Sequence, residues 1–149
     1  MPLVAELNHL LRKIAVKIVV DAYAWIELLI GSSKGNKVKG FLEKAEEVYT
    51  PDTVLAETAR KFLREGTDEE TIKEWIALIT NISVIIPIDS AIALESARSQ
   101  LELIKRAKVL KQNTPSLFDA IVQATAKIKG SKLLTGDEHF RDLPEVIWI

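Results

Sequence analysis

The sequence predicts an α/β fold, a three-layer α/β/α sandwich around a central and mostly parallel sheet. Short apolar runs rich in β-branched residues occupy residues 14–20, 82–88 and 131–135, and stretches with helical periodicity separate them. The runs are almost continuously apolar, which is typical of strands buried on both faces. Strands that alternate with helices indicate a parallel sheet with helices on both faces.

The length and composition predict one ordered domain. A chain of 149 residues is large enough for a real core, so we expect a single domain over residues 1–149, with residues 1–15 as an N-terminal helical extension. With 48% hydrophobic and 28% charged residues, the chain has the composition of a globular protein. The formal net charge of −1 provides no global basic field, so a polyanionic partner would need a local basic patch or a bound metal.

Several protein classes are excluded by what the sequence lacks. The absence of cysteine rules out a disulfide scaffold, a thiolate metal site and a cysteine nucleophile. No apolar run reaches the roughly 18 residues of a membrane span, and the N-terminus lacks the pattern of a secretory signal. We therefore expect a cytoplasmic protein without a membrane partner.

The individual elements follow from periodicity and from helix caps. The predicted strands are residues 14–20, 47–50, 82–88, 131–135 and 146–149. The predicted helices are residues 2–13, 22–30, 51–65, 67–80, 90–109, 116–129 and 138–142. Between the second and third of these, residues 31–40 are predicted to be partly a loop, followed by a helix that ends near residue 45. Pro51 suits the first turn of its helix, Thr67 with Glu70 predicts a capping box, and Gly66 and Gly130 end helices.

Asp21 is the first candidate functional residue, because it ends the predicted strand of residues 14–20. In open α/β sheets, ligands bind in the crevice outside the carboxyl ends of the strands. The alternative is that Asp21 only caps the following helix, as aspartate often does. Asp137 is in the same situation, because it follows the strand of residues 131–135.

Glu57 and Asp119 are the acidic candidates on helices. Glu57 points about 150° away from the centre of the apolar arc of its helix, and the alternative is a solvated ion pair with Lys61 at i+4. Asp119 lies in the first turn of its helix, where it could equally form a capping box with Ser116. Because strand carboxyl ends and the following helix starts share one edge of a parallel sheet, the four acids are expected to converge.

Such a cluster calls for a counter-ion. Two carboxylates about 5 Å apart repel each other by roughly 3 kcal/mol at an effective dielectric constant of 20. Carboxylates and water favour a hard divalent cation, Mg²⁺ or Mn²⁺. Such a metal polarises a phosphoryl oxygen, lowers the pKa of bound water and orients an in-line attack, which indicates phosphodiester hydrolysis.

Four segments, in order, resemble the PIN domain and, within that family, the VapC-type toxin ribonucleases. They are Val20-Asp-Ala-Tyr-Ala-Trp-Ile-Glu27, Val54-Leu-Ala-Glu-Thr-Ala-Arg60, Leu117-Phe-Asp-Ala-Ile-Val-Gln-Ala-Thr-Ala126 and Leu133-Leu-Thr-Gly-Asp-Glu-His-Phe140. The resemblance implies a metal-dependent endoribonuclease that uses Mg²⁺ or Mn²⁺, forms a homodimer and is silenced by an antitoxin peptide. It implies that the metal-binding and catalytic residues are Asp21, Glu57, Asp119 and Asp137, supported by the hydroxyl of Thr135.

The chain also departs from this family. Many relatives carry Thr or Ser just after the first aspartate, where this chain has Ala22 and Tyr23, and the helix before the first strand is longer than in most of the toxins. Among the basic residues, Lys34, Lys37 and Lys39, together with the run of residues 105–111, could contact phosphates or simply form solvated faces.

The competing hypothesis from another class is a PIN-like RNA-processing or scaffold module with little or no nuclease activity. Other hydrolases fit less well, since Tyr23 stands where a haloacid-dehalogenase-type phosphatase needs its second aspartate, and no Walker loop or nucleophile elbow is present. Asp89 is interpreted as a plain helix cap. His9 and His139 are interpreted as too isolated for a histidine metal site.

Overall fold

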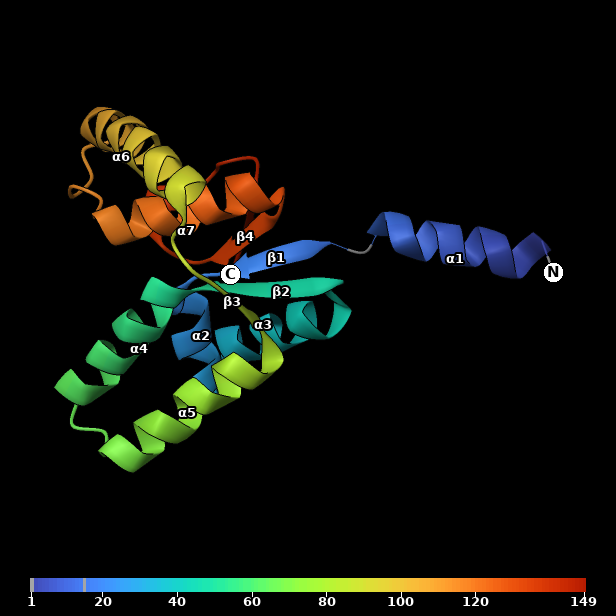
Figure 1. Ribbon diagram of the computed structural model, residues 1–149, viewed down its shortest axis with the longest axis horizontal. Helices are drawn as coiled ribbons and strands as arrows, with labels where there is room; N and C mark the ends of the chain where they lie inside the picture. Colours follow the sequence, from blue (N-terminus) through green and yellow to red (C-terminus); the bar gives the residue numbers. More distant parts are fainter. Residues whose placement is uncertain (1, 15) are drawn as a thin grey trace.

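The protein is built around a five-stranded sheet whose strands all run parallel, as a computed structural model that describes residues 2–14 and 16–149 shows. The strand order is β3-β2-β1-β4-β5, so the chain begins in the middle of the sheet and builds outward in both directions (Figure 1). The strands are β1 (Lys17–Val20), β2 (Glu47–Pro51), β3 (Val84–Ile86), β4 (Lys132–Thr135) and β5 (Val146–Trp148).

Helices cover both faces of this sheet. In Figure 1, α6 and α7 pack together on one face, while α2 to α5 lie on the other. The helices are α1 (Pro2–Ile14), α2 (Ala22–Leu29), α3 (Ser33–Lys44), α4 (Asp52–Arg64), α5 (Glu69–Ile82), α6 (Ser90–Val109) and α7 (Leu117–Lys129), with a short 3₁₀ helix, η1 (Glu138–Phe140). The predicted α/β/α sandwich is therefore confirmed, and its sheet is parallel throughout rather than mostly parallel.

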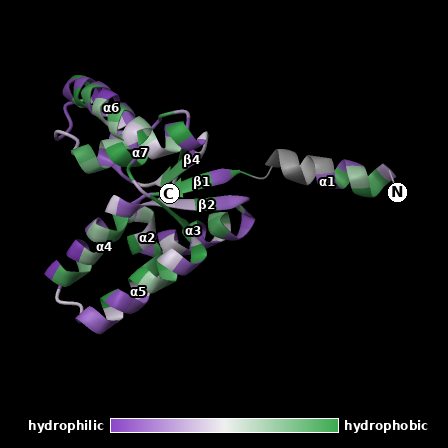
Figure 2. Ribbon diagram, in the orientation of Figure 1, coloured by the Kyte–Doolittle hydropathy of each residue, from purple (hydrophilic) through white to green (hydrophobic). Residues whose placement is uncertain are grey.

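Burial on both faces of the sheet explains why the sequences of the central strands are almost continuously apolar. Ile18, Val19 and Val20 of β1 have no exposed surface, because helices cover the sheet above and below them. The outer helices carry hydrophobic and hydrophilic residues together, as expected for elements with one buried face (Figure 2). Trp25 on α2 is completely buried, and its indole N–H donates a hydrogen bond of 3.1 Å to Thr50 Oγ1.

β3 is shorter and more exposed than the predicted strand over residues 82–88. It forms one edge of the sheet, and within the described residues β2 is its only partner strand, so its outer edge is not covered by another strand. Val84 is 54% exposed, and the chain leaves the sheet after Ile86. An apolar run alone does not separate an edge strand from a central one.

Three predicted boundaries also need correction. Ile14 ends α1 instead of starting the first strand. The segment of residues 31–40 is largely helical, because Ser32 caps α3 by accepting a hydrogen bond from Gly35 N. Helix α5 is capped by Asp68, which accepts from Thr71 N, and not by Thr67.

Helix α1 projects away from the rest of the protein (Figure 1). Its apolar residues Leu3, Val4 and Leu7 are 49–65% exposed. The predicted extension also included residues 1 and 15, which lie outside the described residues. Within residues 2–14 and 16–149, no helix combines the length and the apolar character needed to cross a membrane.

Candidate metal centre

The candidate site lies at the carboxyl ends of β1 and β4, the two neighbouring central strands. Strand order reverses between them, since β2 and β3 extend the sheet on one side and β5 on the other. Such a reversal leaves a crevice beyond the strand ends, where α/β proteins bind ligands. Asp21 directly follows β1, and Asp137 comes two residues after β4.

Asp21 joins the ends of both strands through hydrogen bonds. One carboxylate oxygen, Oδ1, accepts from Ala22 N at 2.8 Å, so Asp21 does cap α2. The other oxygen, Oδ2, accepts from the Thr135 hydroxyl at 2.8 Å. Thr135 Oγ1 also accepts a bond of 3.0 Å from Asp137 N, which ties the two acidic segments together.

Asp119 is both a helix cap and a member of the site. It forms the predicted capping box with Ser116: Ser116 N donates to Asp119 Oδ2 at 2.8 Å, and Asp119 N donates to Ser116 Oγ at 3.2 Å. Capping therefore fixes one oxygen of Asp119 and leaves the other available. The two interpretations of Asp119 are not exclusive.

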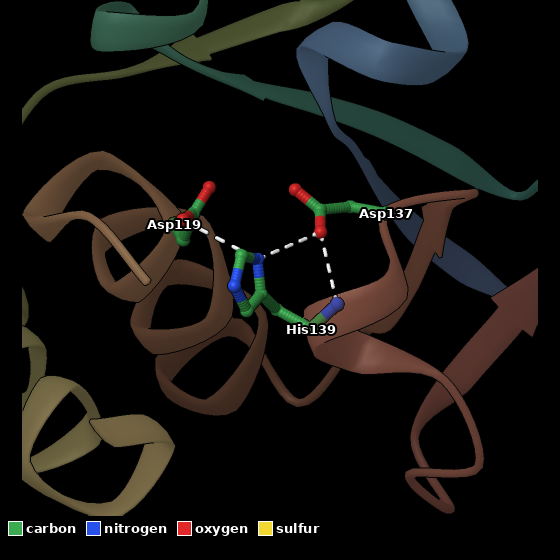
Figure 3. A group of neighbouring side chains, drawn as sticks. All are labelled: Asp119, Asp137 and His139. Carbon is green, nitrogen blue, oxygen red and sulfur yellow. Dashed lines mark hydrogen bonds and ion pairs between the residues drawn. The ribbon is translucent and has the colours of Figure 1, made fainter. Parts of the chain in front are cut away.

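Asp119, Asp137 and His139 form a compact group of possible metal ligands. One donor atom from each lies within 4.8 Å of the others, and Figure 3 shows the two carboxylates on either side of the imidazole. Each carboxylate turns one oxygen toward the space between them (Figure 3). The side chains are 17–28% exposed, so this space is open to a ligand.

His139 belongs to the site, although the sequence suggested that it was too isolated. Its Nδ1 lies 3.0 Å from Asp137 Oδ1 and 3.9 Å from Asp119 Oδ2, and its Nε2 lies 2.8 Å from the carbonyl oxygen of Asn113. Burial lowers the pKa of His139, but the bond to Asn113 and the two carboxylates outweigh it and raise that pKa above 6.5. The metal-free site therefore favours an imidazolium between the acids. A histidine two residues after an aspartate in a tight turn was the signal for this position.

Glu57 lies beside this group rather than in it. The predicted ion pair with Lys61 is not formed, because Lys61 binds Glu65 at 2.5 Å. Glu57 is half-buried instead, and burial together with the charges of Asp119 and Asp137 raises its pKa to about 7, against the opposing effect of Arg60. Among the described residues it has no hydrogen-bond partner for its carboxylate.

The acids interact electrostatically, because neighbouring carboxylates contribute to the raised pKa values of Asp21, Glu57 and Asp119. The pKa of Asp21 is raised to about 7, mainly by burial. The Thr135 hydrogen bond opposes this rise, and the charges of Glu57, Asp137 and Asp119 add to it. Burial and Asp137 also raise the pKa of Asp119. A cation stabilises the charged form of carboxylates whose ionisation is disfavoured by burial and by one another, and this set of carboxylate oxygens suits a hard divalent metal.

Side chains from α6 and the loop after it hold η1 at the site. Arg106 donates to the carbonyl oxygens of His139 at 2.8 Å and Arg141 at 2.5 Å, and Gln112 donates to that of Glu138 at 3.1 Å. Arg106, which the sequence placed among possible phosphate contacts, is therefore committed to the protein backbone. Asp89 caps α6 by accepting from Ile92 N, as predicted.

A cavity of about 430 Å³ lies away from the acids, at the opposite ends of β1 and β4. Its charged lining combines Lys17, Lys129 and Lys132 with Glu46 and Glu145. Its positive and negative side chains are mixed, and they form no group that would bind a single kind of ion. The acidic group remains the candidate functional site.

The fold and the acidic site together define a PIN domain. The family model for the PIN domain matches residues 18–146, so the chain belongs to this family. The comparison with curated proteins gave no match.

Solved structures that are similar to this chain include a toxin and toxin–antitoxin complexes. A toxin–antitoxin complex from Klebsiella pneumoniae is 22% identical, with a TM-score of 0.65 over 87% of this chain and 95% of the other. VapC20 of Mycobacterium tuberculosis, described as a toxin that cleaves the sarcin–ricin loop, is 20% identical, with a TM-score of 0.64 over 83% and 92%. The DNA-bound VapBC complex of Salmonella typhimurium is 15% identical, with a TM-score of 0.68 over 90% and 97%. At these identities the likeness establishes a shared fold.

Proposed function

We propose that this protein is a divalent-metal-dependent endoribonuclease that hydrolyses RNA phosphodiester bonds. The observation that carries the proposal is the meeting of Asp21, Glu57, Asp119 and Asp137 at the sheet's switch point, where two of them have a pKa of about 7. Membership of the PIN family supports it.

Mg²⁺ or Mn²⁺ would be held by Asp119 and Asp137, with Asp21 and Glu57 completing the acidic surroundings. When bound, the metal would stabilise charge on the phosphoryl oxygens and activate water. The Thr135 hydroxyl fixes the orientation of Asp21. Glu57, with a pKa near neutrality and no hydrogen bond to satisfy, is suited to accept a proton at its carboxylate.

The proposal includes the partners implied by the toxin-like fold. One of the similar structures is a toxin–antitoxin complex, as its name states, and another is a DNA-bound VapBC complex. We infer that this chain is the toxin of such a pair, that it forms a homodimer, and that residues 1–149 act as one unit with the α1 region as an extension. Induced expression in bacteria should arrest growth, and sedimentation should give twice the mass of the chain.

The first experiment is a thermal melt with and without millimolar Mn²⁺ or Mg²⁺. Asp119→Asn is the best variant, because its amide oxygen can still accept the capping bond from Ser116 N while the negative charge is lost. Asp89→Asn is the matched control, since Asp89 caps a helix away from the site. We expect the metal to raise the melting temperature of wild type and Asp89→Asn but not of Asp119→Asn.

An RNA cleavage assay on the same proteins completes the test. Cleavage by wild type and Asp89→Asn, but not by Asp119→Asn, would support the nuclease. A metal-dependent rise in melting temperature without cleavage of any RNA in a diverse pool would favour the scaffold hypothesis. If the metal changed the melting temperature of none of the three proteins, the acids would be only helix caps and surface charges, and the metal site would be refuted.

A further inference from the structure

A lysine and a tyrosine flank the acidic centre on the side of α2 and α3. Lys34 Nζ donates a hydrogen bond of 2.7 Å to the Tyr23 hydroxyl and lies 5.1 Å from the centre of the Tyr23 ring. This hydrogen bond raises the pKa of Lys34, because it favours the charged ammonium. The pair therefore presents a fixed positive charge on an aromatic support.

The pair is tied directly to the acidic segment. The Tyr23 ring lies against Gly136, the residue between Thr135 and Asp137, and a Cβ at Gly136 would clash with ring atoms Cε1, Cδ1 and Cζ of Tyr23. Gly136 therefore makes room for the ring at the edge of the site. Tyr23 stands two residues after Asp21, so the ring and the first acid lie on the same segment.

The start of α3 is also held in place, so Lys34 is carried by a rigid segment. The Ser32 hydroxyl caps α3 and donates to the Glu27 carboxylate on α2. Gly35 packs so closely on α2 that a Cβ there would clash with the carbonyl group of Glu27. A side chain on such a support loses little freedom when it binds a ligand.

Lys34 forms no salt bridge with a carboxylate of the described residues. Within the described part of the chain, no carboxylate lies within 4.0 Å of its ammonium, although Glu27 and Glu138 are near enough to influence it. A cation held by a neutral phenol keeps its capacity to bind an anion. The acids beside Lys34 would repel the phosphates of an RNA backbone. A positive charge at the edge of the acidic group would offset part of this repulsion.

We propose that Lys34, supported by Tyr23, binds an RNA phosphate next to the scissile one and so positions the substrate over the acidic centre. This inference rests on the proposed RNA substrate. It distinguishes Lys34 from Lys39, which lies about 140° around α3 from it. Lys34 and Tyr23 are positioning residues here and take no part in the bond-breaking step.

The test is the salt dependence of RNA binding. Fluorescently labelled single-stranded RNAs of two unrelated sequences are titrated with protein in Ca²⁺ at several KCl concentrations, and each RNA is checked for integrity by gel afterwards. One lost phosphate contact lowers the slope of log affinity against log salt by about 0.7 for a single strand. We expect this decrease for Lys34→Gln with both RNAs, and an unchanged slope for the matched control Lys39→Gln.

A double-mutant cycle tests the role of Tyr23. Tyr23→Phe keeps the ring against Gly136 and removes the hydroxyl that holds Lys34, so it should weaken binding less than Lys34→Gln does. Combined with Lys34→Gln it should add little further loss. In cleavage assays both variants should raise KM more than they lower kcat.

Two sets of results would overturn the inference. Equal slopes for wild type and Lys34→Gln, or the same decrease for Lys39→Gln, would show that Lys34 makes no specific phosphate contact. A loss of the Mn²⁺-dependent rise in melting temperature in Lys34→Gln would show that it acts through the acidic site instead. RNA binding that depends on Lys34 but leads to no cleavage would support this inference while contradicting the proposed nuclease activity.

Discussion

Thr135 and Asp21 are 114 positions apart in the chain, yet the Thr135 hydroxyl donates a 2.8 Å hydrogen bond to Asp21 Oδ2. The same hydroxyl accepts from Asp137 N, so a single oxygen atom connects two of the acidic residues. Asp21 is buried, and this bond is the interaction that lowers its pKa while burial and the neighbouring acids raise it. Thr135 thereby favours the ionised form that a metal requires.

Thr135→Val should weaken metal binding while leaving the fold intact. Valine has nearly the same shape but neither donates to Asp21 nor accepts from Asp137 N. Loss of a residue that orients metal ligands reduces metal affinity or activity by about 10–100-fold. Titration of the melting temperature with Mn²⁺ measures this, and Thr135→Ser should retain most of the affinity. Equal Mn²⁺ affinity in wild type and Thr135→Val would refute this role.

Glu57→Gln should stabilise the metal-free protein at pH 8. The ionised Glu57 is half-buried, lies beside Asp119 and has no hydrogen bond to lose. A gain of about 1 kcal/mol corresponds to roughly 2–4 °C in melting temperature for a chain of this size. Cleavage should fall by roughly a thousandfold, because several kcal/mol of metal-assisted catalysis depend on such a group. A lower melting temperature in EDTA would mean that Glu57 has a stabilising partner in solution.

The stability of the metal-free protein should decrease as the pH rises toward 7. The pKa values of Asp21 and Glu57 are about 7 in the folded protein and have ordinary values of 3.8 and 4.5 otherwise. Between these limits the folded protein binds more protons than the unfolded chain, so these two groups lower the free energy of unfolding as pH rises. Melts in EDTA from pH 5 to 8 should show this decrease, and Glu57→Gln should show a flatter profile.

Metal affinity should follow the opposite trend, because the cation binds the ionised carboxylates. The rise in melting temperature caused by Mn²⁺ should therefore be larger at pH 8 than at pH 5.5. A rise of equal size at both pH values would indicate that the metal binds elsewhere.

His139→Asn should strengthen Mn²⁺ binding at pH 6.5. The imidazolium of His139 lies 3.0 Å from Asp137 and 3.9 Å from Asp119, where its positive charge opposes a cation. Removing that charge should raise the Mn²⁺ affinity severalfold at pH 6.5, with a smaller effect at pH 8.5. Calorimetric titrations at the two pH values distinguish this from direct ligation, in which the variant would bind more weakly at both.

Local pattern was sufficient to predict the parts of the site that lie next to regular elements. Asp21 and Asp137 follow apolar strands, and parallel strands bring their carboxyl ends to one edge. The Ser116–Asp119 capping box was also predictable, because its residues are three positions apart. The sequence could not decide whether a capping residue also belongs to the candidate site, and in the structure Asp21 and Asp119 cap helices and also lie in the acidic group.

The features that the sequence did not reveal depend on contacts between distant segments. His139 is oriented by the carbonyl of Asn113, which lies 26 positions earlier. Glu57 has no ion-pair partner among the described residues because Lys61 binds Glu65 instead, and sequence does not decide between these two equally spaced i+4 pairs. The edge position of β3 depends on the strand order, which periodicity does not encode.

The strand order also determines when the acidic centre can form during synthesis of the chain. β1 is made early, but its neighbour β4 and the residues Thr135 and Asp137 follow more than 110 positions later. A growing chain therefore cannot assemble the acidic centre until residues 132–137 have left the ribosome. The proposed nuclease activity can therefore arise only after the chain has been synthesised as far as Asp137.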